Sequence, residues 1–277
     1  MLRCSHKSTN CENAMQTKTT LRAAIILQTL LFSSPLSRRD FITTSSVLAL
    51  NTNTNTKINT MTNTSEDRSG QKSKIWDRFA KGYAEQPIAD QEAYEKKLSL
   101  TQQYLKKDME VLEYGCGTGG TSIIHAPFVK HILATDISGK MLEAAQKRLE
   151  ESPVKNVEFQ QVSIDQLELE KESKDVVLGL SILHLLKNRD EAIAKTYQWL
   201  KPGGLFVTST TCMGSMGAAP LLKCVLPVVS FFGAVPYVNP MTKEDLRESL
   251  IKNKFEIEYE WQPKKDAAVF IIARKSA

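Results

Sequence analysis

Residues 111–120 read VLEYGCGTGG, and residues 132–136 read ILATD. The apolar start of the first stretch is typical of a buried strand, and its glycines permit positive φ and close approach of a ligand to the main chain. The second stretch is another apolar strand that ends in Asp136, 21 residues after Gly115. In doubly wound α/β folds, a carboxylate at this strand tip binds a ribose diol. The two stretches therefore predict a binding site for an adenosine-containing cofactor.

The glycines alone do not distinguish two common cofactors of this type. Gly115, Gly117 and Gly120 satisfy the G-x-G-x-x-G pattern of dinucleotide-binding proteins. With Gly119 in place of Gly120, the loop equally satisfies the G-x-G-x-G pattern of enzymes that use S-adenosylmethionine (SAM). Glu113 favours SAM, because its carboxylate would attract the ammonium and sulfonium groups of SAM and repel a pyrophosphate. A glycine-rich turn without a ligand is the alternative, which the paired carboxylate at the second strand disfavours.

Length, charge and cysteine content limit the function further. The chain has 277 residues and a formal net charge of +5. Residues 1–60 contain seven Lys or Arg against two acidic residues, whereas the other 217 residues contain 29 basic and 29 acidic residues. The folded part thus lacks the net positive charge expected of a nucleic-acid-binding protein. Five cysteines without a C-x-x-C pair predict neither a disulfide framework nor a metal site.

Residues 1–65 differ in composition from the rest of the chain, and we interpret them as a targeting leader with a linker. They are rich in Ser, Thr and Asn and poor in acidic residues, as organelle transit peptides are. The apolar stretch at residues 23–32 (AAIILQTLLF) is too short to span a bilayer but fits the core of a signal peptide. Residues 51–64 (NTNTNTKINTMTNT) have the low complexity of a disordered linker.

The leader predicts targeting to an organelle, with a plastid favoured over a mitochondrion. Residues 37–50 contain Arg38-Arg39 in an element that resembles a twin-arginine signal. Initiation at Met61 would instead yield a cytosolic form that retains the whole folded domain. An unstructured tail without a targeting role is the alternative.

Apolar periodicity predicts an α/β domain over residues 66–277. We expect helices at residues 75–84, 90–105, 121–126, 138–151, 190–200 and 242–252, with Asp90 and Ser138 as N-caps. We expect strands at residues 110–114, 131–136, 157–162, 175–180, 205–210, 255–261 and 267–273, and a tight turn at residues 201–204. The link between the last two strands is so short that they must form an antiparallel hairpin. The expected fold is a doubly wound, mostly parallel, seven-stranded sheet.

At this level of detail the chain resembles the class I SAM-dependent methyltransferases, specifically the small type 11 group. The strings that carry the resemblance are VLEYGCGTGG, ILATDIS with MLEAA, DVVLGLSILHLL and WLKPGG. Each string is weak alone, but four in the right order make a specific signal over about residues 76–275. The resemblance implies a Rossmann-like fold, SAM as cofactor, and methyl transfer to a small-molecule acceptor.

The resemblance also assigns roles to individual positions. It implies that the glycine loop lies under the methionine part of SAM, that Asp136 holds the ribose, and that Tyr83 closes over the cofactor. Ser163 departs from the Asp that the family often has beside the adenine. The full set of predicted cofactor-binding residues is Tyr83, Glu113, Gly115, Cys116, Gly117, Gly119, Asp136, Ile137, Met141, Ser163, Ile164, Asp165 and Leu180.

Several of these positions have structural alternatives. Cys116 fits a small filler of the loop, Met141 fits helix packing, and Ile137 fits the core. His184 follows the fourth strand and is the candidate general base, but the family also places His there for structural reasons. His125 and His131 are expected to be structural.

The acceptor site is expected at the substrate side of the fourth strand, at Ser181, and under a cap formed by residues 212–240. That segment is strongly apolar and includes Phe231 and Phe232, which we predict to contact the acceptor. It favours a lipophilic or small apolar acceptor. A peripheral membrane contact through residues 221–235 and additional core are the alternatives.

Two other functions remain open from the sequence. One is a nicotinamide-dependent oxidoreductase, against which the glutamate before the loop and the C-terminal hairpin argue. The other is a catalytically silent SAM-binding assembly protein, which the intact glycine loop disfavours.

Overall fold

The computed structural model describes residues 65–212, 236–264 and 267–276, with side chains from residue 73 onward. Residues 86–89 fall outside the larger compact unit of the chain, and the fold below is that of the larger unit. Several sequence predictions lie outside the described residues: the leader with residues 23–32 and Met61, and residues 221–235 with Phe231 and Phe232.

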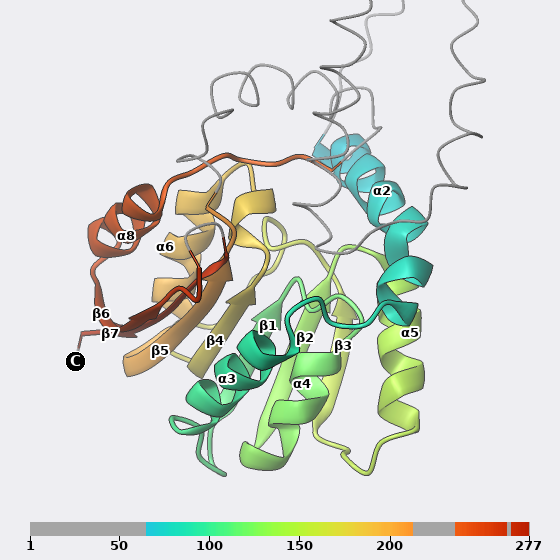
Figure 1. The fold of residues 1–277 in the computed structure, drawn as a ribbon, viewed down its shortest axis with the longest axis horizontal. Helices are drawn as coiled ribbons and strands as arrows, with labels where there is room; N and C mark the ends of the chain where they lie inside the picture. Colours follow the sequence, from blue (N-terminus) through green and yellow to red (C-terminus); the bar gives the residue numbers. More distant parts are fainter. Residues whose placement is uncertain (1–64, 213–235, 265–266, 277) are drawn as a thin grey trace, which may run out of the picture. The chain divides into compact units, whose positions relative to one another are not determined.

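One mixed sheet organises the domain, with strand order β3-β2-β1-β4-β5-β7-β6 (Figure 1). Strands β1 to β5 are parallel to one another, and β7 is antiparallel to both β5 and β6. The doubly wound sheet with a C-terminal hairpin is therefore confirmed. The strands are β1 (Glu110–Tyr114), β2 (His131–Asp136), β3 (Val157–Gln161), β4 (Lys174–Leu180), β5 (Leu200–Thr210), β6 (Phe255–Trp261) and β7 (Val269–Lys275).

Helices cover both faces of the sheet (Figure 1). They are α2 (Ser65–Glu85), α3 (Gln91–Gln102), α4 (Gly120–His125), α5 (Gly139–Glu150), α6 (Arg189–Trp199) and α8 (Lys243–Lys252), with short 3-10 helices at Ala126–Phe128 and Leu183–Leu185. Both expected N-caps are confirmed: Asp90 accepts from the Ala93 N–H, and the Ser138 hydroxyl accepts from the Met141 N–H. Such caps stabilise a helix by about 1 kcal/mol each. Among the described residues, no helix is both long and apolar enough to cross a membrane.

Alternate residues of the central strands supply two separate cores. In β5, Phe206 packs with α6 and α8 on one face, whereas Val207 packs with the α3 side on the other. Both side chains are essentially inaccessible to solvent. Burial of each such side chain contributes about 1.5–3 kcal/mol. A strand buried on both faces holds its carboxyl end in a fixed place, which a binding site at that edge requires.

Two sequence predictions about local structure were wrong. Residues 201–204 do not form a separate turn but lie within β5, because Leu200 pairs with Lys174 and Leu205 pairs with Val176. The intervening residues bulge out, and Gly203 takes φ 76°, which a glycine adopts without strain. Helix α2 also begins ten residues before the expected helix at residues 75–84, since its first turns are polar and carry no apolar periodicity.

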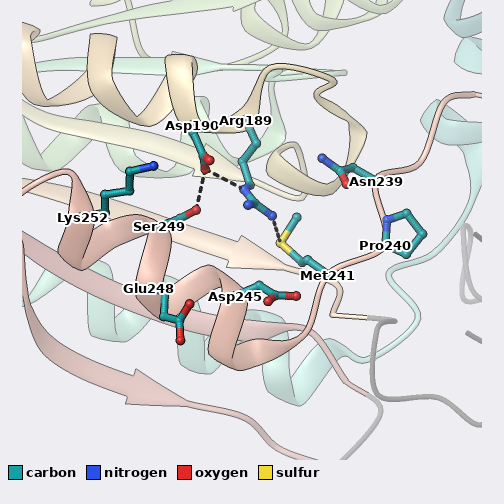
Figure 2. Close-up of a pocket in the computed structure, with 9 residues that line it drawn as sticks. All are labelled: Arg189, Asp190, Asn239, Pro240, Met241, Asp245, Glu248, Ser249 and Lys252. Atoms are coloured by element: carbon teal, nitrogen blue, oxygen red, sulfur yellow. Dashed lines mark hydrogen bonds and ion pairs between the residues drawn. The ribbon is translucent and has the colours of Figure 1, made fainter.

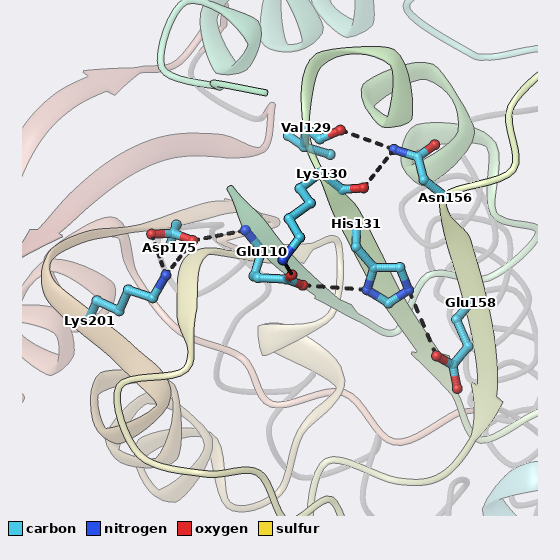
Figure 3. Close-up of polar contacts among 8 residues, drawn as sticks. All are labelled: Glu110, Val129, Lys130, His131, Asn156, Glu158, Asp175 and Lys201. Carbon is cyan, nitrogen blue, oxygen red and sulfur yellow. Dashed lines mark hydrogen bonds and ion pairs between the residues drawn. The ribbon is translucent and has the colours of Figure 1, made fainter. Parts of the chain in front are cut away.

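Charged side chains link neighbouring strands at the amino-terminal edge of the parallel sheet (Figure 3). Asp175 accepts hydrogen bonds from the Glu110 N–H at 2.8 Å and from Lys201 Nζ at 2.8 Å. The predicted structural residue His131 has its Nδ1 3.5 Å from a Glu110 carboxylate oxygen and its Nε2 3.8 Å from one of Glu158. These pairs satisfy one another, so this edge serves to hold the sheet together.

Candidate cofactor and acceptor site

The glycine loop joins β1 to α4 at the carboxyl-terminal edge of the sheet. Gly115, Gly117 and Gly119 all have positive φ, of 68°, 54° and 70°. A Cβ on Gly115 would lie 2.8 Å from the Ile182 side chain, and one on Gly119 would lie 2.6 Å from the Phe159 ring. A Cβ on Gly117 would meet nothing within 4 Å. Two of the glycines are thus required by packing of the protein itself, whereas Gly117 faces open space that a ligand would fill.

Neighbouring elements hold the loop in this conformation. The Cys116 N–H donates to the Thr135 carbonyl of β2 at 3.0 Å, and burial holds the pKa of the Cys116 thiol well above its usual value. Arg148 of α5 donates to both the carbonyl and the hydroxyl of Thr118, at 3.0 and 2.9 Å. Cys116 is therefore a protonated filler of the loop, and Arg148 is a positioning residue that the sequence analysis missed.

Glu113 is a buried acid directly below this loop. Glu113 is 3% exposed, and one of its carboxylate oxygens accepts a hydrogen bond from the Ser122 hydroxyl. Burial raises the pKa of Glu113 to about 7, against the opposing effect of the Ser122 hydrogen bond and with a smaller contribution from Asp136. A ligand cation placed against this carboxylate would favour its charged form.

Asp136 ends β2 and closes the other side of the loop. One of its oxygens accepts from the Gly117 N–H at 2.9 Å, and the other accepts from the Ser138 N–H at 2.9 Å. Burial raises the pKa of Asp136, while these backbone hydrogen bonds oppose the rise. A carboxylate has about four acceptor positions, and the backbone partners of Asp136 are Gly117, Ser138 and Ile137, so one position remains for a ribose hydroxyl.

Helix α2 is tied to the N-terminus of α5 next to Asp136. The Asp77 carboxylate accepts hydrogen bonds from the Ser138 hydroxyl at 2.6 Å and the Lys140 N–H at 3.2 Å. Tyr83, two turns further along α2, is 42% exposed, and desolvation followed by the charge of Asp136 raises the pKa of its hydroxyl. The predicted closing residue Tyr83 therefore lies near the predicted ribose ligand, and Asp77 is the contact that brings it there.

The predicted adenine-side residues lie on loops after β2 and β3. The Ile137 carbonyl accepts from Gln161 Nε2 at 3.1 Å, and the Ser163 hydroxyl donates to Gln166 Oε1 at 2.9 Å. The Asp165 carbonyl accepts from Lys195 Nζ at 2.9 Å. Two further members of the predicted set, Met141 and Ile164, are only 3% and 7% exposed. Both fill the interior here, and their cofactor contacts stay a prediction.

The expected acceptor side lies at the ends of β4 and β5. Leu180 ends β4 and is half-buried, and the exposed Ser181 after it has φ 56°, a strained value for a residue with a side chain. Its N–H donates to the Ser209 carbonyl of β5 at 2.7 Å, which links the two strand ends. Strain of this kind persists only where surrounding structure enforces it, and it is frequent at binding sites.

His184 lies on the short 3-10 helix that follows. It is 7% exposed, its Nδ1 has no hydrogen-bond partner among the described residues, and burial lowers its pKa to about 4. The ring is therefore neutral at physiological pH, as a general base must be. Its role as the base stays a prediction. His125, expected to be structural, is buried in the same way at the end of α4.

Helix α3 contributes two residues that the sequence analysis did not single out. The Tyr94 hydroxyl lies 3.2 Å from the Thr121 hydroxyl at the start of α4, and Lys97 Nζ donates to the Ser209 hydroxyl at 3.0 Å. The two are three residues apart and share one face of the helix. Their spacing was visible in the sequence, but their partners lie 27 and 112 residues away, and no local pattern identifies such contacts.

A hollow of about 460 Å³ lies between α6 and α8 (Figure 2). Two of its charged side chains are paired with protein groups: Asp190 accepts from Arg189 Nε at 3.1 Å and from the Ser249 hydroxyl at 2.5 Å, and Arg189 also donates to the Met241 sulfur at 3.3 Å. None of the predicted cofactor residues lines it. We therefore place the cofactor site at the glycine loop and not in this hollow. The described residues also contain no cluster of three or more His, Cys, Asp or Glu fit to hold a metal ion.

Comparison with known proteins agrees with this fold. The profile of the methyltransferase domain family matches residues 105–262, more than half of the chain, and the chain belongs to this family. Over 105 residues it is 36% identical to malonyl-[acyl-carrier protein] O-methyltransferase of Halalkalibacterium halodurans, a match that covers 36% of this chain and 38% of that protein. Over 104 residues it is 34% identical to demethylmenaquinone methyltransferase of Leptospira interrogans, covering 36% of this chain and 41% of that protein.

The chain thus spans about two fifths of the length of these relatives. A solved methyltransferase structure from Bacillus halodurans superposes with a TM-score of 0.56 and 19% identity, covering 66% of this chain and 98% of the other. This likeness confirms the class I methyltransferase fold that the sequence predicted. It does not bear on the individual site residues.

Proposed function

We propose that this protein transfers a methyl group from SAM to a small acceptor with an apolar body. The observation that carries the proposal is the open space at Gly117, whose N–H donates to Asp136, together with the buried carboxylate of Glu113 in β1. Glu113 would accommodate a cation and Asp136 retains an acceptor position for a ribose hydroxyl, which matches the two ends of SAM. The residues present therefore fit this cofactor.

When bound, SAM supplies a methyl group on a sulfonium, whose bond to carbon breaks toward sulfur as the acceptor atom attacks. The protein has to hold the two reactants in line and exclude water, which contributes about 7–11 kcal/mol to lowering the barrier. Glu113 would hold the ammonium end, Asp136 a ribose hydroxyl, and Tyr83 of α2 would cover the nucleoside. No strong acid–base pair is needed unless the nucleophile is a hydroxyl. In that case neutral His184 is the candidate to accept its proton.

The apolar character of the acceptor is supported by the sequence of residues 212–240, which follow β5 at the acceptor side. By their names, two relatives act on different acceptors: one on malonyl-[acyl-carrier protein] and the other on demethylmenaquinone. Contact of residues 221–235 with a membrane surface is the alternative role for this segment. Phe231→Ser and Phe232→Ser distinguish the roles, by raising the acceptor KM, lowering stability, or lowering membrane association.

A screen of metabolite extracts with SAM carrying a labelled methyl group tests the proposal. The full-length protein should transfer label to an extractable small molecule, and Gly117→Val should not. Label that stays on SAM in every extract, despite measurable SAM binding, would favour a catalytically silent SAM-binding protein.

We also propose that residues 1–65 direct the protein to an organelle, with a plastid favoured. The support is the acid-poor, hydroxyl-rich composition with Arg38-Arg39 and the apolar stretch at residues 23–32. A fluorescent protein fused to residues 1–65 should enter plastids. Diffuse cytosolic fluorescence would exclude a targeting role.

A further inference from the structure

Lys97 carries a half-buried ammonium group at the carboxyl-terminal edge of the sheet. Among the described residues, its ammonium donates one hydrogen bond, to the Ser209 hydroxyl at 3.0 Å. An ammonium has three donors, so two remain for other partners. Desolvation lowers the pKa of Lys97, with the nearby charge of Asp90 opposing it. A cation desolvated in this way is costly unless an anion compensates it.

The carboxylate of Asp90 acts on Lys97 from a distance, but among the described residues no carboxylate is in ion-pair contact with the ammonium. One oxygen of Asp90 caps α3 by accepting from the Ala93 N–H. Residues 213–235, which follow β5, contain neither Asp nor Glu. An anion in direct contact with Lys97 therefore has no evident source in the segment that leaves this edge of the sheet.

The position of Lys97 separates it from the expected cofactor. The glycine loop and Asp136 follow β1 and β2, whereas Ser209 is the penultimate residue of β5. In the strand order, β5 lies two strands from β1 on the side away from β2, which is about 10 Å at ordinary strand spacing. The Ser181 N–H, just after β4, donates to the Ser209 carbonyl of β5. The ends of β4 and β5 therefore lie side by side next to the Lys97 ammonium.

We propose that Lys97 and Ser209 bind an anionic group of the acceptor, so that the acceptor is an amphiphilic acid with a carboxylate or similar head and an apolar body. The proposal rests on the proposed methyl transfer and names the substrate class for it. Lys97 donates its two remaining hydrogens to the anion. The Ser209 hydroxyl holds the ammonium in place, since Ser209 itself is only 2% exposed.

Octanoate and 1-octanol, which share an apolar body and differ in charge, are the probes. Binding of each to the full-length protein saturated with S-adenosylhomocysteine is measured by calorimetry. Wild type should bind octanoate at least about tenfold more tightly than 1-octanol, the usual effect of a charge-assisted hydrogen bond. Lys97→Met should lose this preference and Lys97→Arg should keep most of it. Lys96→Met is the matched control, because the Lys96 ammonium lies 4.3 Å from the centre of the Trp261 ring and should have no effect.

Equal binding of the two probes to wild type, or an unchanged preference in Lys97→Met, would overturn the proposal. The cofactor also has a carboxylate, which is a second anion that Lys97 would attract. 5′-Methylthioadenosine lacks this carboxylate, so a comparison of the two ligands shows whether Lys97 contacts the cofactor. If Lys97→Met weakens S-adenosylhomocysteine about tenfold or more but leaves 5′-methylthioadenosine unchanged, Lys97 serves the cofactor and the acceptor assignment is wrong. Absence of S-adenosylhomocysteine binding to wild type would be a failure of the proposed function, which the octanoate comparison does not test.

Discussion

The carboxyl ends of β1 and β2 differ in charge and construction from those of β4 and β5. The first pair carries two buried carboxylates, Glu113 and Asp136, which lie against backbone N–H groups and a hydroxyl, and β1 is followed by the glycine loop. The second pair has serines at its ends and the Lys97 ammonium of α3 beside it, without a carboxylate in ion-pair contact among the described residues. We infer that one edge is divided into a half suited to a cationic, diol-bearing cofactor and a half suited to an anionic acceptor.

The largest expected effect comes from a side chain placed in the cofactor half, at Gly117. Gly117→Val should abolish measurable SAM binding, because its side chain would occupy the open space beside the loop. Gly203→Val is the matched control, since Gly203 also has positive φ and no atom within 4 Å of an added Cβ, but lies in the β5 bulge. Both variants should lose about 1–3 kcal/mol of stability from backbone strain.

Thermal unfolding with and without S-adenosylhomocysteine measures both the stability and the ligand binding of Gly117→Val and Gly203→Val. If both variants keep the ligand-induced shift in melting temperature, Gly117 does not face the cofactor.

A second, smaller effect concerns Asp136. Asp136→Ala should weaken SAM binding by about 1.5–3 kcal/mol, the range for a charge-assisted hydrogen bond removed from a site. Asp175→Ala is a control at the opposite edge, where the carboxylate pairs with Lys201 (Figure 3). It should lower stability and leave SAM affinity unchanged. Equal SAM affinity in wild type and Asp136→Ala would remove the ribose role.

The buried acid Glu113 predicts a pH dependence of cofactor binding. Its pKa is raised from 4.5 to about 7, and a cationic ligand favours its charged form. SAM affinity should therefore rise about tenfold between pH 6 and 8 and then level off, with a proton released on binding below pH 7. Glu113→Gln should bind with a nearly flat pH profile. Calorimetry in buffers of different ionisation enthalpy measures the proton, and a flat wild-type profile would contradict the assignment.

The same pKa shift has a consequence for stability. Glu113 binds its proton more tightly in the folded state than in the unfolded chain. Its contribution to the free energy of unfolding therefore falls as pH rises from about 4.5 to 7. Above pH 7 the contribution is level. In Glu113→Gln this component of the pH dependence should be absent.

The smallest expected effect is at the acceptor half. Ser181→Gly should raise stability by about 0.5–1 kcal/mol, because it relieves the positive φ of a residue with a side chain. SAM affinity should stay the same, while turnover should fall if the serine contacts the acceptor. Chemical denaturation measures the gain. A loss of stability would show that the serine side chain contributes more than its strain costs.

The sequence predicted the sheet because its central parallel strands are largely apolar and are separated by helix and turn signals. Val176 to Leu180 of β4 is the clearest example, in which burial on both faces leaves a continuous apolar run. The bulge in β5 was not predictable in this way. KPGG has the composition of a turn, and only the pairing of Leu200 and Leu205 with β4 shows that the strand continues around it.

The cofactor half of the site was predictable for a related reason. Its residues lie within a few positions of the strand ends, so the order of the strands brings them together. Asp77, Arg148, Tyr94 and Lys97 were not predicted, because they act through contacts with residues 27 to 112 positions away. Gly115, Gly117 and Gly119 looked equivalent in sequence, and only the neighbours of each distinguish packing from ligand space.

Calorimetric titration of the full-length protein with S-adenosylhomocysteine and with NADH tests the central claim most directly, because both ligands carry an adenosine ribose with a free diol but differ in charge at the other end. The account predicts one site for S-adenosylhomocysteine, whose ammonium would lie against Glu113, and no binding of the anionic NADH. Binding of NADH, or no binding of S-adenosylhomocysteine, would contradict it.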